Sequence, residues 1–210
     1  MKKKLTFLVI CFAICFLVNG VQAEEFCCDA YSDKIDEYAT ALSMDDEEFL
    51  EMEYDCSSIN WLMLTYAHQY DEISLAYAYY DVDNNGIPEL IFADGFNVID
   101  IYTLKDGKII KLYKECFFGE RVRLYVLSQG YLMTEGANSA SSSICEICMI
   151  DPETSELTDC LTAFYYDDCG LWEDREDAFS VDPYQYYAMV DDWVNNSVYA
   201  EIDWIYIGKE

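Results

Sequence analysis

The residues best suited to chemistry gather between Leu75 and Ala93, where two apolar runs flank a short polar loop. Carboxylate or amide side chains stand at its first, third, fifth and ninth places, and Gly86 stands at the sixth, where such loops turn sharply. Oxygens in this spacing suit Ca²⁺, a hard cation that takes about six to eight oxygen ligands. We expect water or a nearby acid such as Asp94 to complete the shell. The predicted protein ligands are Asp81, Asp83, Asn85, the carbonyl of Ile87, and Glu89.

The loop differs from an EF-hand. An EF-hand requires a bidentate Glu at its twelfth place, where this chain has Phe92, and its flanks are helical. The flanks here are rich in Tyr, Ile and Phe, which favours strands. A plain hairpin is the alternative, because Asn84-Asn85-Gly86 can turn without metal. Three carboxylates within nine residues favour the metal site.

The pattern resembles the Asp-x-Asp-x-Asp-Gly-x-x-Asp loop of integrin-type (FG-GAP and VCBS) repeats, in which a side chain at the ninth place replaces the twelfth. Asn85 and Glu89 depart from the commonest residues of that loop but keep its oxygens. The run from Tyr80 to Ile91 and the run from Ile101 to Leu112 are also similar to poorly characterised secreted proteins and lipoproteins of Gram-positive bacteria. The resemblance implies an exported calcium-loop protein and says almost nothing about activity.

Catalytic residues are not identifiable from the sequence. The single histidine, His68, lies among apolar neighbours, and no nucleophile-elbow pattern surrounds any serine. A pair among the 41 acidic residues could act as a glycosidase, and the 19 Tyr and four Trp could stack against sugars. These types are so numerous that they specify no site, and aromatic residues also fill cores and strands.

Cysteines form the other chemical group. Eight lie beyond residue 23, and an even number in an exported chain predicts disulfides, with buried free thiols as the alternative. The predicted hairpin centred on Asp151–Ser155 brings Cys148 opposite Cys160, which is our predicted pair. Cys145 and Cys148 form a CxxC in a strand-like run, where residues three apart face opposite sides, so we expect structural cysteines. The eight are Cys27, Cys28, Cys56, Cys116, Cys145, Cys148, Cys160 and Cys169.

The N-terminal segment has the order of a secretory signal peptide. Three lysines precede an apolar run from Leu5 to Val18, and Val21-Gln22-Ala23 offers a small-residue cleavage site. The run is shorter than the roughly 20 residues that span a bilayer, and no later stretch is long enough either. We therefore expect residues 1–23 to be removed and the remainder to be secreted, without a membrane span.

The composition excludes some classes of protein and of partner. The formal net charge of −29 repels nucleic acid and anionic lipid, so neither is an expected partner. A hydrophobic share of 53% with 16% aromatics excludes a disordered chain. Residues 24–210 are enough for one domain with a sizeable core.

Periodicity predicts an α+β fold, with an N-terminal helical segment, a mainly antiparallel β-meander and a C-terminal helix. Residues 24–72 are mostly helical by spacing, and residues 73–210 mostly β, with a helix near 183–195 that begins at Asp182-Pro183. Small polar residues predict a loop over 135–143, and acidic residues predict another over 167–177. Residues 202–207 are predicted as a closing strand.

The leading hypothesis is a secreted binding or interaction module stabilised by a structural Ca²⁺, with an extracellular carbohydrate or protein as its ligand. The alternative is an extracellular carbohydrate-active hydrolase that uses a pair of Asp or Glu residues.

Overall fold

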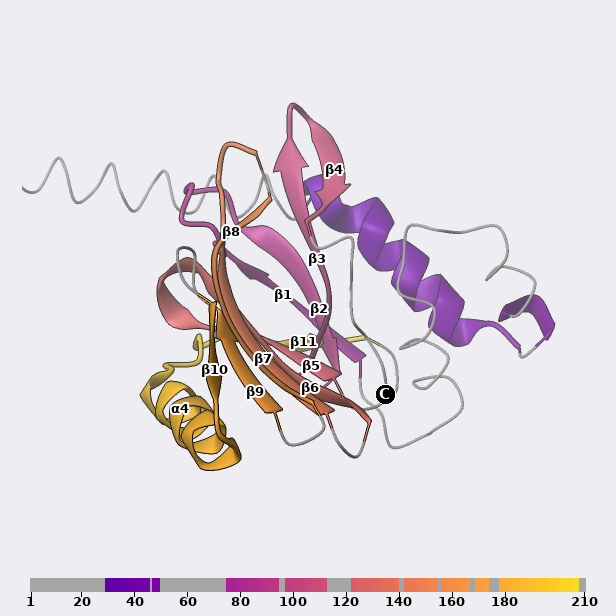
Figure 1. Ribbon diagram of the computed structural model, residues 1–210. Coiled ribbons are helices and arrows are strands. Elements are labelled where there is room, and N and C mark those ends of the chain that lie inside the picture. Colours follow the sequence, from indigo (N-terminus) through magenta and orange to yellow (C-terminus); the bar gives the residue numbers. More distant parts are fainter. Residues whose placement is uncertain are drawn as a thin grey trace, which may run out of the picture.

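The fold is α+β, as predicted, with a helix near the N-terminus, antiparallel strands and a helix near the C-terminus (Figure 1). The predicted signal segment, residues 50–72 of the predicted helical segment and His68 lie outside the residues that the structure describes. The computed structural model describes residues 29–45, 47–49, 75–94, 97–112, 122–139, 142–154, 156–166, 169–173 and 178–207.

The strands form two antiparallel sheets. The first sheet has the order β11-β1-β2-β3-β4, and the second has the order β10-β9-β8-β7-β6-β5. The first consists of β1 (Leu75–Tyr80), β2 (Glu89–Asp94), β3 (Asn97–Lys105), β4 (Lys108–Lys111) and β11 (Ile205–Tyr206). The second consists of β5 (Val122–Val126), β6 (Tyr131–Ser139), β7 (Ser142–Ile150), β8 (Leu157–Tyr166), β9 (Cys169–Glu173) and β10 (Ala178–Val181).

The hairpins follow the turn signals of the sequence. β1 and β2 pair across the acidic loop, and β3 and β4 pair across Asp106-Gly107. Asp106 and Gly107 both have positive φ, as a tight hairpin turn requires. A short 3₁₀ helix, η1 (Ser128–Gly130), joins β5 to β6.

Two predicted loops are wrong. β6 continues to Ser139 and β7 begins at Ser142, so most of the predicted loop over 135–143 is paired strand. β9 occupies the middle of the predicted loop over 167–177 and pairs with β8. Small or polar residues are poor strand formers alone, but neighbouring strands on a sheet override that preference because they satisfy the backbone hydrogen bonds.

The first sheet is buried on both faces. The helix of residues 29–43 packs on one face, where Tyr38 stacks on Phe92 with ring centroids 3.7 Å apart. Ile91 and Ile101 on the other face belong to a core cluster shared with Leu124 of the second sheet. This double cover explains why five of the six residues of β2 are buried.

Helix α4 (Pro183–Asn196) covers the second sheet. Asp182 caps it in a capping box with Gln185, as the Asp-Pro signal predicted, and Tyr186 and Trp193 pack against strand residues such as Ala163. No helix in the described ranges is long and apolar enough to cross a membrane.

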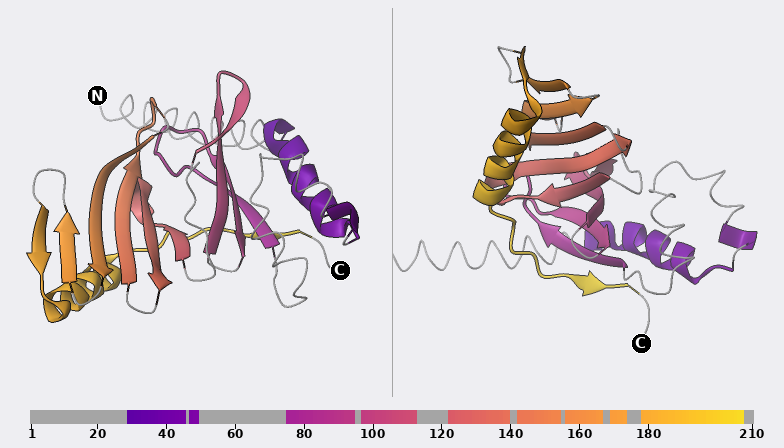
Figure 2. Two further views of the ribbon diagram at one scale, coloured as in Figure 1. Left: turned by 45° about the vertical axis from the view of Figure 1, so that its right-hand side comes forward. Right: turned by 60° about the horizontal axis from the view of Figure 1, so that its bottom comes forward.

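The chain then runs back from α4 past both sheets to the free edge of β1 (Figure 2). This C-terminal segment, residues 198–207, pairs with β5 through Ala200 N and Val126 O at 3.1 Å, and with β1 through Ile207 N and Leu75 O at 2.8 Å. The predicted closing strand over 202–207 is therefore shorter than expected, since only Ile205–Tyr206 form β11.

Candidate functional site

The acidic loop, residues 81–88, is held by hydrogen bonds to its own backbone. The Asp83 carboxylate accepts from Asn85 N at 3.0 Å, and the Asp81 carboxylate accepts from Gly86 N at 3.0 Å. Asn84 and Gly86 have φ of 58° and 87°, a left-handed conformation that turns the chain sharply. The fold thus bends the loop inward around its carboxylates.

Three carboxylates converge inside this loop. Asp81, Asp83 and Glu89 each offer an oxygen, and these oxygens all lie within 4.8 Å of one another. Asp83 is 7% exposed and Glu89 is fully buried, so water screens their repulsion poorly. Asp81 Oδ1 is buried and has no hydrogen-bond partner among the described residues. Buried carboxylates this close together repel one another, and a positive charge among them would stabilise their ionised forms.

Glu89 has the most perturbed environment of the three. Its carboxylate accepts hydrogen bonds from Val82 N at 2.8 Å and from Thr103 Oγ1 at 2.9 Å. Burial, and after it the negative charge of Asp83, raise the pKa of Glu89 to about 8. Burial also raises the pKa of Asp83, and the charge of Asp81 contributes. A cation among them would favour the ionised forms.

The other predicted ligands are placed as follows. The Asn85 side chain donates to Asp83 Oδ2 at 2.9 Å and accepts from Ile87 N at 2.7 Å, so it lies beside the cluster. The Ile87 carbonyl stays a predicted ligand. Asp94, predicted as a supplementary ligand, stands at the opposite end of β2 from Glu89, about 17 Å away at the usual rise per residue. Asp94 therefore does not belong to the cluster.

Sequence reasoning missed two supports of the loop. Thr103, from β3, fixes Glu89, and only the strand register brings them together. Gly130, in η1, has φ of 85°, and a Cβ at that position would lie 2.5 Å from Asn84 Nδ2 and 3.1 Å from Val82 O. The turn between β5 and β6 therefore approaches the loop at a position where the positive φ and the lack of room for a Cβ both favour glycine.

The cysteines confirm the predicted proximity of one pair. The sulfur atoms of Cys148 and Cys160 lie 2.20 Å apart, at disulfide distance, across β7 and β8. Cys145 is a buried free thiol whose pKa rises to about 12, first because of burial. Cys145 packs under α4, whereas Cys148 pairs with Leu132, whose side chain faces the first sheet. The CxxC residues thus face opposite sides.

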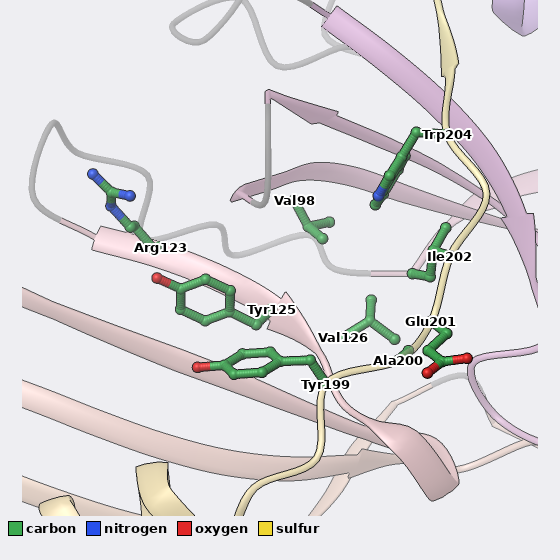
Figure 3. Close-up of a pocket in the computed structure, with 9 residues that line it drawn as sticks. All are labelled: Val98, Arg123, Tyr125, Val126, Tyr199, Ala200, Glu201, Ile202 and Trp204. Carbon is green, nitrogen blue, oxygen red and sulfur yellow. The ribbon is translucent and has the colours of Figure 1, made fainter.

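A second concave feature lies between the sheets beside the C-terminal segment (Figure 3). This aromatic pocket has a volume of about 580 Å³ and a mostly apolar lining. Among its described lining residues, Arg123 is the single cation and Glu201 the single carboxylate. The lining consists of Val98, Arg123, Tyr125, Val126, Tyr199, Ala200, Glu201, Ile202 and Trp204.

No family model, curated protein or solved structure matches the chain. The resemblance of the acidic loop to integrin-type calcium loops therefore stays a prediction. The geometry of the loop and of the aromatic pocket is the basis for the functional argument.

Proposed function

We propose that this chain is a secreted, calcium-stabilised binding module, in which Asp81, Asp83 and Glu89 hold a structural Ca²⁺. The observation that carries the proposal is the convergence of these three carboxylates, together with the unpartnered buried oxygen of Asp81. Converging carboxylate oxygens suit a hard cation, and one cation would offset the repulsion of all three.

The ion would act on the fold rather than on a substrate. Asp81 and Glu89 lie at the two ends of the loop between β1 and β2, so a shared cation would fix the loop at both ends. Asn85 and the Ile87 carbonyl would complete part of the shell. β1 and β2 lie in the middle of the first sheet, so a fixed loop would stabilise the sheet itself.

An extracellular setting is part of the proposal. The signal-like segment over residues 1–23 supports it. Extracellular calcium modules bind with Kd on the order of 10⁻⁴ to 10⁻³ M, which suits a calcium-rich medium. In the proposed module the aromatic pocket is the place for an extracellular ligand.

Thermal melting with and without calcium tests the metal site. Millimolar Ca²⁺ should raise the Tm of the wild type above its value in EDTA, and a hundredfold excess over Kd corresponds to about 2.7 kcal/mol. Mg²⁺ should substitute poorly, because it demands a tighter octahedral shell. The double variant Asp81→Asn/Asp83→Asn should lack the calcium response.

The matched control is Asp191→Asn/Asp203→Asn, which removes two exposed carboxylates outside the loop. It should keep the wild-type response. If the wild type melts identically in EDTA and in Ca²⁺, and calorimetry shows no binding heat, the loop is only a turn. Turnover of chromogenic glycosides would instead support the alternative prediction of a hydrolase.

A further inference from the structure

The aromatic pocket combines an aliphatic floor with aromatic walls. Val98, Val126 and Ile202 lie in its middle, Tyr125 and Tyr199 flank one side, and Trp204 flanks the other (Figure 3). Its volume of about 580 Å³ is within the usual range for small-molecule sites. A ligand therefore meets hydrocarbon and ring surfaces over most of its area.

The rings come from separate parts of the chain and are held in place. Tyr125 belongs to β5, whereas Tyr199 and Trp204 belong to the C-terminal segment. Tyr125 and Tyr199 pack edge to face, with centroids 5.5 Å apart and planes at 70°. The faces of such rings carry negative electrostatic potential, and Tyr and Trp attract cations within about 6 Å of the ring centre.

The charges around the pocket favour a positive ligand. Arg123 lies opposite Glu135 in the strand register and its charge acts on Asp94, so two carboxylates stand near it, although within the described residues it forms an ion pair with neither. Glu201 lies at the other end of the pocket (Figure 3) and takes part in no ion pair within the described part of the chain. The net charge of −29 adds a long-range attraction for cations.

We propose that the aromatic pocket binds an organic cation, an ammonium group with apolar substituents, against Tyr125, Tyr199 and Trp204 with Glu201 as the counter-charge. The inference rests on the proposed function, because it names the ligand class of the binding module. An inorganic cation would lose its water to a lining that supplies few oxygens. An organic anion, which would pair with Arg123, is disfavoured by Glu201 and by the net charge.

Three probes of one shape separate charge from hydrophobic burial. They are choline, its neutral isostere 3,3-dimethylbutan-1-ol, and the anion 3,3-dimethylbutanoate. Each is titrated into the full secreted chain at constant ionic strength, and binding is followed by saturation-transfer NMR. Choline should bind about tenfold tighter than the neutral isostere, as desolvated cation–π contacts allow. The anion should bind most weakly.

Matched variants test whether choline binds in the aromatic pocket. Tyr199→Leu and Glu201→Gln should each weaken choline binding at least severalfold, while the affinity for the neutral isostere changes less with Glu201→Gln. Tyr206→Leu and Asp203→Asn are the controls, since both residues are exposed and lie outside the lining. They should leave choline affinity unchanged. Melting temperatures of all variants report whether the fold is retained.

Equal affinity for choline and its neutral isostere would overturn the inference in favour of a plain hydrophobic pocket. Tightest binding of the anion, lost in Arg123→Gln, would overturn it in favour of an organic-anion site. Absence of binding by choline, or equal loss in the control variants, would also reject it. The calcium melting response is measured on the same samples, so failure of the pocket inference and failure of the calcium proposal are separate results.

Discussion

At the residue scale, Glu89 ties the acidic loop to the interior of the first sheet. Its carboxylate is fully buried and accepts hydrogen bonds from the loop through Val82 and from β3 through Thr103. Those two bonds favour the ionised form, but burial and the charge of Asp83 outweigh them. Glu89 is therefore where the charge of the loop and the stability of the sheet are coupled.

The raised pKa of Glu89 predicts a pH dependence of the metal-free protein. Its folded pKa of about 8 lies above the ordinary value of 4.5, so the folded state favours the protonated form. This contribution is fully present below about pH 4.5 and is lost as pH rises through about 8, an effect on the order of a few kcal/mol. In EDTA, Tm should fall across that interval.

In the proposed site, Ca²⁺ would hold Glu89 ionised, so Ca²⁺ should oppose this fall and its binding near neutral pH should release protons. Calorimetry in buffers of different ionisation enthalpy measures that release. Glu89→Gln should flatten the pH dependence in EDTA, whereas the control Glu146→Gln, on the second sheet, should keep it. A wild-type Tm that rises from pH 5 to pH 8 in EDTA would contradict the argument.

At the scale of elements, η1 links the acidic loop to the aromatic pocket. Gly130 lies close to the loop, since a Cβ added to it would be 2.5 Å from Asn84 Nδ2 and 3.1 Å from Val82 O. Ser128 N, at the start of η1, donates to Val198 O at 2.7 Å, and Leu127 forms a bridge with Tyr199. The same short turn therefore lies against the acidic loop on one side and a pocket wall on the other.

Gly130→Ala should destabilise this junction. The left-handed backbone costs an alanine about 1 to 2 kcal/mol, and crowding against Asn84 and Val82 adds about 1 to 3 kcal/mol. Gly107→Ala is the control, because its φ of 71° is similar but no atom lies within 4 Å of the added Cβ. Urea unfolding measures both. Equal losses of unfolding free energy in the two variants would show that the packing of Gly130 against the loop does not contribute to stability.

The N-terminal helix is attached to the first sheet by a buried polar group. Tyr38 donates to Asp100, which is 1% exposed, forms an ion pair with Lys111 and also accepts from Tyr102. Burial of this carboxylate is tolerated because its partners surround it. The helix and the sheet are thus joined by a hydrogen bond to a charged group as well as by apolar packing.

Tyr38→Phe should lower the free energy of unfolding by about 1.5 to 3 kcal/mol, because it removes a hydrogen bond to a charged group. Tyr31→Phe, on the same helix, loses a neutral bond to Pro88 O at 3.3 Å and should cost about 1 kcal/mol or less. Urea unfolding of both variants gives the comparison. A larger loss of unfolding free energy in Tyr31→Phe than in Tyr38→Phe would show that the bond to Asp100 is not the stronger of the two.

At the scale of the whole molecule, charge repulsion acts against folding. The chain carries 41 acidic and 12 basic residues, so compaction brings like charges together. In EDTA, Tm should rise as NaCl increases from about 0.01 M to 0.15 M, since the Debye length shrinks from about 30 Å to 8 Å. Near pH 4 the effect should shrink, because many carboxylates are protonated. A Tm independent of salt would contradict this.

The features that depend on local sequence patterns could be predicted from the sequence. Apolar alternation and the turns at Asn84–Gly86 and Asp106-Gly107 predicted the hairpins, and the spacing of Asp81, Asp83 and Glu89 predicted their convergence. The division into two sheets, the support from Thr103 and Gly130, and the aromatic pocket were not predictable. They join residues far apart in the chain, and no local pattern records such pairings.

The path of the C-terminal segment sets an order of assembly. Residues 198–207 supply Tyr199 and Trp204 to the pocket and the last strand to the edge of β1. In a chain that emerges N-terminus first, these residues follow β1 to β10, so those strands can pair before the pocket has its second and third rings. The edge of β1 stays open over the same interval and is a place for wrong pairing. The proposed pocket would thus be complete only after the strands of both sheets that precede it in the chain have emerged.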